Sequence, residues 1–274
     1  MKKAMAFLLC TVMTAGMLAG CGSKTAETTA STETAASTET AASTEGSGSE
    51  AAEKTSDKKW VVATDTVFKP FEYTNDQNEF VGIDVDLLAA IAEDQGFEYE
   101  LQSLGWDAGV AAVQAGQADA LIAGATIKQE RIDSGWIFSD GYYNATQTFV
   151  VSEDSDIASY EDLKGKNVAV KNGTAGADFA NSLKDEYGFT VTVFEDSPTM
   201  YQDVILGNSA ACVEDTPIMA ASIKEGNLAL KIPEGMESDG APYGLAIMDE
   251  KNKGLEDIKA NGTYDEIIAK YLGE

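Results

Sequence analysis

The sequence has no histidine among its 274 residues and only three cysteines. Without histidine, the catalytic triads that use an imidazole base are excluded. The shortage of nitrogen and sulfur ligands also argues against zinc or copper, so we expect no metal site. The cysteines are Cys10, Cys21 and Cys212. Two of them lie in the terminal region that we assign to targeting below, so the folded part has no internal disulfide and depends on its core for stability.

Basic residues are also scarce, with 19 Lys and Arg against 46 Asp and Glu. This balance argues against a nucleic-acid partner and against electrostatic binding to anionic lipid. The sequence has no phosphate-binding glycine loop followed by Lys-Ser or Lys-Thr, so we expect no nucleotide and no other cofactor. After the first twenty residues, no apolar run is long enough for a membrane helix.

The N-terminal segment is typical of an export signal. Lys2 and Lys3 precede an apolar stretch over 4–18, and Leu18-Ala19-Gly20-Cys21 looks like a bacterial lipobox. We therefore expect residues 1–20 to be a lipoprotein signal peptide and Cys21 to carry the lipid. The alternative is an ordinary secretory signal with an incidental cysteine. The lipobox predicts a protein tethered to the membrane, extracytoplasmic and on its outer face.

Residues 21–57 have the composition of a flexible linker. They are mostly Thr, Ala, Ser and Glu in imperfect repeats, with no aromatic and no large aliphatic residue. Such a segment cannot bury enough apolar surface to offset the entropy of ordering. A long acidic tether suits a lipoprotein that reaches through an envelope layer, which favours a bacterium with a single membrane and a thick wall.

The remaining residues, about 215, show the alternation of an α/β fold. Short apolar runs predict strands that are buried on both faces. These strands are expected at 60–63, 120–123, 167–170, 191–194, 211–213 and 245–248. The length fits one large domain or two of about 100 residues each.

Amphipathic segments between the strands predict helices. Ile83, Leu87 and Ile91 recur every four residues, and Gly96 ends that helix. Ser197 is expected to cap a helix that continues to Gly207. Further helices are expected at 107–116 and 264–272.

Two segments are candidates for crossings between lobes, at 140–144 and 240–244. If the chain crosses at both, one lobe comprises 58–142 plus 243–274 and the other comprises 143–242. Two crossings would form a hinge with a cleft between the lobes. Because open α/β sheets bind ligands at the carboxyl ends of their strands, the cleft is the expected site.

Several segments in order carry a resemblance to a known family over residues 59–272. They are Val62-Ala-Thr-Asp-Thr-Val-Phe-Lys-Pro-Phe-Glu72, Gly82-Ile-Asp-Val-Asp-Leu87, Ala123-Gly-Ala-Thr-Ile-Lys-Gln-Glu-Arg131, Phe138-Ser-Asp-Gly-Tyr-Tyr143, Val168-Ala-Val-Lys-Asn-Gly-Thr174, Asp215-Thr-Pro217 and Asn261-Gly-Thr-Tyr-Asp265. The sequence resembles the family 3 solute-binding proteins of polar amino acid ABC transporters, and most of all the glutamine binders.

The resemblance implies a type II periplasmic-binding-protein-like fold, with two α/β lobes joined by a two-strand hinge. It also implies a function: a monomeric, non-enzymatic protein that captures a polar amino acid and delivers it to an ABC permease with its ATPase subunit.

A buried amino acid needs a partner for each of its two charges, because an unpaired buried charge costs several kcal/mol. Arg131 has the planar fork that suits a carboxylate, and the family uses the arginine at this position for it. Thr126 and the amides of the loop that includes Thr174 and Ala175 would join this clamp. By the resemblance, Asp215 and the carbonyl of Gly124 would bind the ligand ammonium.

The rest of the predicted site surrounds the ligand side chain. Phe68 and Trp106 match the family's aromatic walls. Asp65 and Lys171 occupy the positions at which glutamine binders hold the side-chain amide. A carboxylate accepts from the amide NH₂ group and an ammonium donates to its carbonyl.

Three residues depart from the glutamine-binding pattern. Glu214 stands where a histidine is common, Ala175 where glycine is usual, and Trp106 where phenylalanine is usual. Glu214 could pair with Lys171 or help to hold a cationic side chain. Asp65 disfavours an acidic ligand, because two buried carboxylates repel each other. Glutamine therefore leads, followed by arginine, lysine or histidine.

Two other classes compete with the binding protein. Some relatives with this fold are dehydratases, and Glu214 could act as a general acid if burial raised its pKa. The other alternative is a receptor's sensor domain, which would normally continue into a membrane helix and a signalling domain. This chain ends at Glu274.

Overall fold

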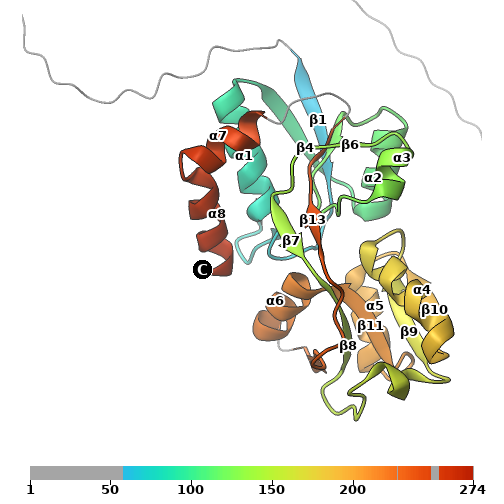
Figure 1. The fold of residues 1–274 in the computed structure, drawn as a ribbon. Coiled ribbons are helices and arrows are strands. Elements are labelled where there is room, and N and C mark those ends of the chain that lie inside the picture. Colours follow the sequence, from blue (N-terminus) through green and yellow to red (C-terminus); the bar gives the residue numbers. More distant parts are fainter. Residues whose placement is uncertain (1–57, 227, 248–252, 274) are drawn as a thin grey trace, which may run out of the picture. The chain divides into compact units, whose positions relative to one another are not determined.

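The computed structural model describes residues 58–226, 228–247 and 253–273. The predicted signal peptide, Cys21 and the predicted linker lie outside these residues, as does Met248 at the end of one predicted strand. The described chain alternates strands and helices, and it contains two five-stranded mixed sheets. We refer to each sheet with its helices as a lobe (Figure 1).

The sheet of the first lobe has the strand order β4-β1-β5-β14-β6. Its strands are β1 (Lys59–Thr64), β4 (Glu98–Ser103), β5 (Ala120–Leu121), β6 (Ile137–Phe138) and β14 (Ala246–Ile247). β1 runs parallel to β4 and β5, whereas β14 is antiparallel to β5 and β6. A strand from late in the chain therefore lies inside a sheet that is otherwise built from early residues.

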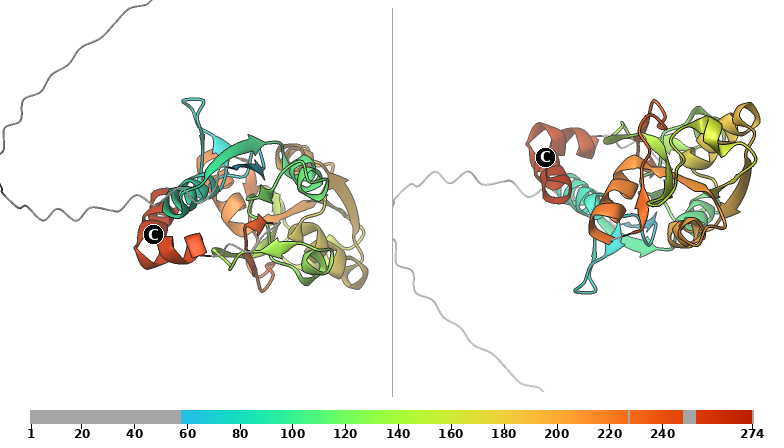
Figure 2. Two further views of the ribbon diagram at one scale, coloured as in Figure 1. Left: turned by 90° about the horizontal axis from the view of Figure 1, so that it is seen from above. Right: turned by 90° about the horizontal axis from the view of Figure 1, so that it is seen from below.

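Helices cover this sheet. They are α1 (Ile83–Gln95), α2 (Trp106–Gln114), α3 (Gln129–Asp133), α7 (Lys253–Ala260) and α8 (Thr263–Leu272). The two C-terminal helices pack beside α1, as the views of Figure 2 also show. α1 ends as predicted at Gly96, which adopts the left-handed conformation at φ 64°. A hairpin of β2 (Tyr73–Thr74) and β3 (Phe80–Val81) precedes α1.

The sheet of the second lobe has the order β10-β9-β11-β8-β12. Its strands are β8 (Gln147–Ser152), β9 (Asn167–Lys171), β10 (Thr190–Phe194), β11 (Ala211–Asp215) and β12 (Leu230–Lys231). The helices are α4 (Ala175–Tyr187), α5 (Ser197–Ile205) and α6 (Thr216–Gly226), with a 3₁₀ turn at Tyr160–Leu163. Separate apolar clusters around Phe149 and Met200 form its core.

Two expectations about local structure need correction, and the sequence did not predict every strand. β10 is not buried on both faces, because it is an edge strand and Val193 is 57% exposed. The side chain of Asp196, not that of Ser197, caps α5 by accepting from the Thr199 amide. β4 and β8 were not predicted; β4 alternates exposed and half-buried residues, which removes the uniformly apolar signal.

Two antiparallel strands run between the lobes. They are β7 (Tyr143–Ala145) and β13 (Ala241–Tyr243), paired at Tyr143 with Tyr243 and at Ala145 with Ala241. β13 lies in one of the segments predicted as crossings, and β7 overlaps the other. The division of the chain at 142/143 and 242/243 stays a prediction. Within the described residues, no helix has the length and apolar character needed to cross a bilayer.

Candidate functional site

A small cavity lies between the two lobes. All eleven residues predicted as ligand-binding line it, together with Ala123. The first lobe contributes Asp65, Phe68, Trp106, Ala123, Gly124, Thr126 and Arg131, and the second contributes Lys171, Thr174, Ala175, Glu214 and Asp215.

The topology explains why residues so distant in sequence meet. Asp65 directly follows β1, Lys171 ends β9 and Asp215 ends β11. The carboxyl ends of parallel strands meet at one edge of a sheet, and in each lobe this edge faces the cavity. The parallel strands thus bring these charged side chains together at the cavity.

Arg131 lies at the boundary between the lobes. Its Nη1 donates to the Thr126 carbonyl at 2.7 Å, and its Nη2 donates to the Gly173 carbonyl of the other lobe at 3.0 Å. The guanidinium stacks over the Trp106 ring, 4.9 Å from the ring centroid. Burial lowers its pKa, although nearby carboxylates oppose this effect. The fork is therefore held in one plane at the cavity wall.

The N-terminal end of α4 faces the same part of the cavity. The Thr174 hydroxyl caps this helix by accepting from the Ala177 amide at 3.2 Å and donates to the Lys171 carbonyl at 2.9 Å. Ala175 is the first residue of the helix. A helix N-terminus beside Arg131 is a favourable environment for an anion.

Asp215 is held by two donors and is buried. Gln147 Nε2 donates to its Oδ1 at 3.0 Å, and the Tyr243 hydroxyl donates to its Oδ2 at 2.5 Å. Burial and the neighbouring Glu214 raise the pKa of Asp215 to about 7. A ligand ammonium beside this carboxylate would lower its pKa again, so the site is suited to a cation.

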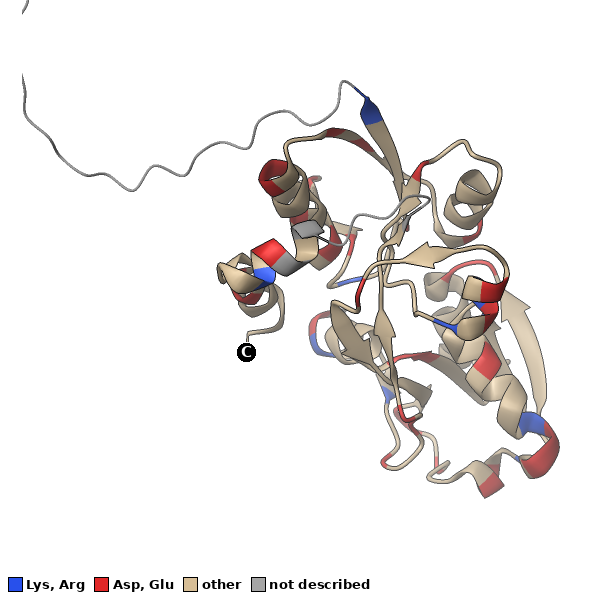
Figure 3. Ribbon diagram, turned by 45° about the horizontal axis from the view of Figure 1, so that its top comes forward, with Lys and Arg blue, Asp and Glu red and all other residues tan. Residues whose placement is uncertain are grey.

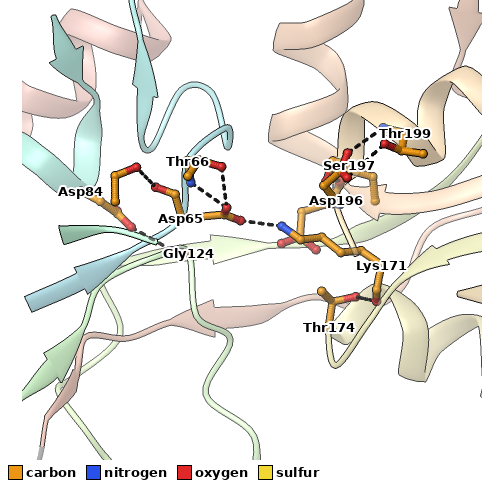
Figure 4. Close-up of polar contacts among 12 residues, drawn as sticks. Asp65, Thr66, Asp84, Gly124, Lys171, Thr174, Asp196, Ser197 and Thr199 are labelled. Atoms are coloured by element: carbon orange, nitrogen blue, oxygen red, sulfur yellow. Dashed lines mark hydrogen bonds and ion pairs between the residues drawn. The ribbon is translucent and has the colours of Figure 1, made fainter. Parts of the chain in front are cut away.

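Lys171 and Asp65 form an ion pair across the cavity at 2.5 Å (Figure 4). Both side chains are almost completely buried. Burial lowers the pKa of Lys171, but the carboxylates of Asp65 and Glu214 outweigh it, so the pKa lies above its ordinary value. The Thr66 amide also donates to Asp65, at 2.6 Å. The two members of the pair present an acceptor and a donor side by side.

Glu214 lines the cavity, and its carboxylate accepts hydrogen bonds from donors of its own lobe. Its Oε2 accepts from the Ser197 hydroxyl at 2.7 Å and from the Tyr201 hydroxyl at 2.8 Å. Its Oε1 accepts from the Asp215 amide at 2.9 Å. Three donors of its own lobe therefore hold the Glu214 side chain in place.

Gly124 shows why a residue without a side chain is needed in this wall. It adopts φ 53°, and a Cβ atom there would lie 2.4 Å from Phe68 Cε1. Its amide donates to Asp84 Oδ2 at 2.8 Å (Figure 4). The Phe68 ring packs against Gly124 because that position has no Cβ.

Residues that support the site were missed from the sequence. Gln147 and Tyr243 hold Asp215, Ser197 and Tyr201 hold Glu214, and Asp84 holds Gly124. Gln147 and Asp84 carried a usable signal, because Gln147 shortly precedes the apolar run 149–151 and Asp84 stands between Ile83 and Val85. The two tyrosines gave none, since tyrosine is common in cores.

Acidic positions occur over both lobes and outnumber basic ones (Figure 3). Despite this, the described part of the chain holds no group of three or more His, Cys, Asp or Glu side chains that could bind a metal ion. The carboxylates of the cavity face cations and hydroxyls instead.

Comparison with known proteins identifies the family. Residues 60–274 match the bacterial extracellular solute-binding proteins, family 3. The chain belongs to this family. The match covers most of the chain and both lobes, which confirms the predicted resemblance to this family and places the protein outside the cytoplasm. The predicted likeness to the glutamine binders within the family is not part of this match.

Similar proteins support the assignment. The arginine-binding extracellular protein ArtP of Bacillus subtilis is 32% identical over 82% of this chain and 89% of its own. The arginine-, lysine-, histidine-binding protein ArtJ of Geobacillus stearothermophilus matches with a TM-score of 0.72 and 32% identity, over 79% of this chain and 96% of its own. An ancestral arginine-binding protein solved with bound glutamine matches with a TM-score of 0.71 and 34% identity. The match covers 79% of this chain and 98% of the ancestral protein.

These structures confirm the predicted two-lobed, type II fold of this family 3 protein. The similar proteins are named for binding and not for catalysis. Their names point to amino acids as the class of ligand, and they include both cationic amino acids and glutamine.

Proposed function

We propose that this protein captures one polar amino acid, glutamine, outside the cell and delivers it to the permease of an ABC transporter, whose ATPase subunit supplies the energy. A lipid on Cys21 would hold it at the outer face of the membrane as a monomer. The observation that carries the proposal is the set of charged side chains around one cavity, which complements each part of an amino acid.

The two ends of the cavity suit the charges of the amino acid backbone. Arg131 and the N-terminal end of α4 would bind the carboxylate. Asp215, with a pKa of about 7 before a cation arrives, would bind the ammonium, aided by the Gly124 carbonyl. Each charge of the ligand then meets a charge of opposite sign when it enters the cavity. This attraction offsets the free energy that removing the ligand charges from water would cost.

The Asp65–Lys171 pair supports glutamine as the ligand. Its carboxylate and ammonium are 2.5 Å apart, so a side-chain amide that approaches them finds an acceptor for NH₂ and a donor for its carbonyl. A cationic side chain at the same place would lie beside the Lys171 ammonium. Phe68 and Trp106 would contact the aliphatic stem.

A cationic amino acid is the second candidate, favoured by a different observation. Three carboxylates (Asp65, Glu214 and Asp215) line the cavity against two cations (Arg131 and Lys171). The cavity therefore has one excess negative charge. A zwitterion such as glutamine has no net charge and leaves this excess in place, whereas arginine, with a net charge of +1, would balance it. The names of ArtP and ArtJ agree with this candidate.

The contacts between the lobes suggest how capture proceeds. Arg131 reaches the Gly173 carbonyl, Asn172 Nδ2 donates to Asp107 at 3.0 Å, and Lys128 pairs with Asp178. In an open form these bonds would be broken, and the ligand would first meet Arg131, Thr126 and the aromatic walls. Closure would add Lys171 and Asp215 and exclude water, giving the permease a closed shape to recognise.

Calorimetry of the full chain, refolded to remove any bound amino acid, tests the ligand. Tight binding of glutamine with weak binding of arginine, lysine and histidine supports the first candidate. The reverse order overturns glutamine in favour of the cationic candidate. If none of the twenty amino acids binds, the proposal as a whole is wrong, and turnover assays for a dehydratase would be the next step.

The lipid anchor needs a separate experiment. Cells that express the wild type and Cys21→Ser are fractionated after metabolic labelling with a fatty acid. We expect label and membrane association in the wild type and in the matched control Cys10→Ser, and neither in Cys21→Ser. Equal labelling of the wild type and Cys21→Ser would contradict the anchor.

A further inference from the structure

Two carboxyl groups, Glu72 and Asp84, lie together beneath the ligand cavity in the first lobe, both fully buried. Both Glu72 oxygens and Asp84 Oδ1 have no hydrogen-bond partner when the two groups are taken as carboxylates. The backbone brings the two residues side by side, because the Asp84 amide donates to the carbonyl of Phe71, the residue before Glu72. A hydrogen bond between the two carboxyls would require a proton on one of them. Two unprotonated carboxylates would repel each other in a site shielded from water.

The chain entering α1 brings the two carboxyls together. The Ile83 amide donates to the Pro70 carbonyl at 3.0 Å, and the Asp84 amide donates to the Phe71 carbonyl at 2.9 Å. Gly82 allows this approach, because a Cβ there would lie 2.0 Å from the Phe71 carbonyl oxygen. The N-terminal end of α1 is thereby fixed against the segment that contains Glu72.

The other oxygen of Asp84 connects two functional parts of the protein. Oδ2 accepts from the Gly124 amide at 2.8 Å and from the Tyr142 hydroxyl at 3.0 Å. Gly124 belongs to the cavity wall, and Tyr142 directly precedes β7, one of the two strands between the lobes. Glu72 holds the wall as well, since its carbonyl accepts from the Phe68 amide at 2.7 Å.

We propose that Glu72 and Asp84 share one proton and that this protonated pair positions Gly124 and Tyr142 for ligand binding. The proton lets Glu72 donate to Asp84 Oδ1 while Asp84 Oδ2 keeps its two donors. Loss of the proton leaves two adjacent carboxylates, which move apart and release Gly124 from its close contact with Phe68. The consequence for affinity rests on the proposed function, whereas the shared proton does not.

The charged and titratable groups around the pair favour one bound proton. Burial, Asp84 and Asp65 raise the pKa of Glu72 well above its usual range, and Lys171 opposes them only in part. The pKa of Asp84 is raised by burial to about 6, although Gly124, Tyr142 and Glu72 all stabilise its charged form. Tyr142 stays neutral, because burial and the two carboxyls raise its pKa. These directions favour Glu72 as the protonated member of the pair and Asp84 as the carboxylate.

Substitutions of Glu72 test the positioning role. Glu72→Ala removes the donor and leaves Asp84 Oδ1 unsatisfied, and we expect the dissociation constant for the bound amino acid to rise about tenfold. Glu72→Gln carries a permanent amide donor and should restore most of that loss. Equal losses in the Ala and Gln variants, or no loss in either, would overturn the positioning role. Thermal unfolding of each variant without ligand shows whether the fold is retained.

The pH profile separates the shared proton from a packing effect. Wild-type affinity should fall at alkaline pH more steeply than that of Glu72→Gln, because only the wild type can lose the proton. The ligand amino group, Lys171 and Asp215 titrate in both proteins, so the difference between the two profiles reports on the pair. Parallel profiles would overturn the proposal.

Carbon-13 NMR of protein labelled at the glutamate carboxyl gives a readout that needs no ligand. The Glu72 signal is assigned by its absence in Glu72→Gln. We expect a protonated carboxyl at neutral pH that titrates well above the other glutamates. A Glu72 signal that titrates with them overturns the shared proton, while a failure of all amino acids to bind would affect only the proposed function.

Discussion

The two halves of the cavity are built differently. The first lobe presents the rings of Phe68 and Trp106 together with one charge of each sign, Arg131 and Asp65. The second lobe contributes no aromatic ring and presents three charges, Lys171, Glu214 and Asp215, at the ends of two strands. The first lobe thus combines apolar walls with balanced charge, whereas the second carries the excess negative charge of the cavity. Substitutions in each half should separate these roles.

The largest effect is expected for Arg131→Ala. Removing the guanidinium leaves a buried ligand carboxylate without its partner, at a cost of about 3–5 kcal/mol, or roughly a hundredfold to several thousandfold in affinity. The loss should be similar for every amino acid that binds, since all carry the carboxylate. Calorimetry checks this, with the exposed Lys166→Ala as the control for removal of a cation. A loss below about tenfold would show that the carboxylate binds elsewhere.

Asp215→Asn should cost less but change the response to pH. The pKa of Asp215 is raised to about 7 without ligand, and the ligand ammonium favours its charged form, so binding below pH 7 releases a proton. Wild-type affinity should therefore fall as pH decreases below about 7, by up to about tenfold per pH unit. Asp215→Asn should bind about 30-fold more weakly at about pH 8 and lose this dependence. A variant that keeps the wild-type pH profile would assign the proton to another group.

Glu214→Gln should alter selectivity more than affinity. The amide keeps much of the shape of the carboxylate but removes one negative charge from the second-lobe wall. We expect the ratio of glutamine to arginine affinity to increase about tenfold. Competition between the two ligands measures the ratio directly, with the exposed Glu186→Gln as the control. An unchanged ratio would make Glu214 a structural residue that serves only Ser197 and Tyr201.

The smallest effect on ligand affinity is expected for an exposed ion pair between the lobes. Lys69 of the first lobe pairs with Glu225 of the second, and both side chains are substantially exposed. Exposed pairs contribute about 0.2–1 kcal/mol, so Lys69→Met should weaken binding about twofold at low salt and have no effect at high salt. A double-mutant cycle with Glu225→Gln isolates the pair. A salt-independent change would instead assign the effect to packing of the Lys69 side chain on Tyr73, which it overlies.

Much of the fold was predictable because its signals are local. The period of Ile83, Leu87 and Ile91 predicted α1, and Gly96 predicted its end. β4 was missed because it alternates half-buried and exposed residues, and β8 because its apolar run begins with Gln147 and Thr148. Neighbouring elements decide burial in these strands, and a local pattern does not contain that information.

The site was predictable only in part for a similar reason. Its lining residues follow strand ends in segments that resemble a family, and all eleven meet at one cavity. The residues behind them, such as Tyr243 and Asp84, act through hydrogen bonds to partners 28 and 40 positions away. Such pairings depend on topology, so the sequence predicted which groups face the cavity but not what holds them in place.

The position of β14 has a consequence for biogenesis. All strands of the second sheet lie between residues 147 and 231, whereas the first sheet needs Ala246 and Ile247 to join β5 to β6. During synthesis from the N-terminus, the second lobe can complete its sheet while the first still lacks an inner strand. A nascent chain that ends at residue 243 should then yield a protease-resistant fragment of the second lobe alone. The order of synthesis would delay formation of the binding cleft until β14 has emerged.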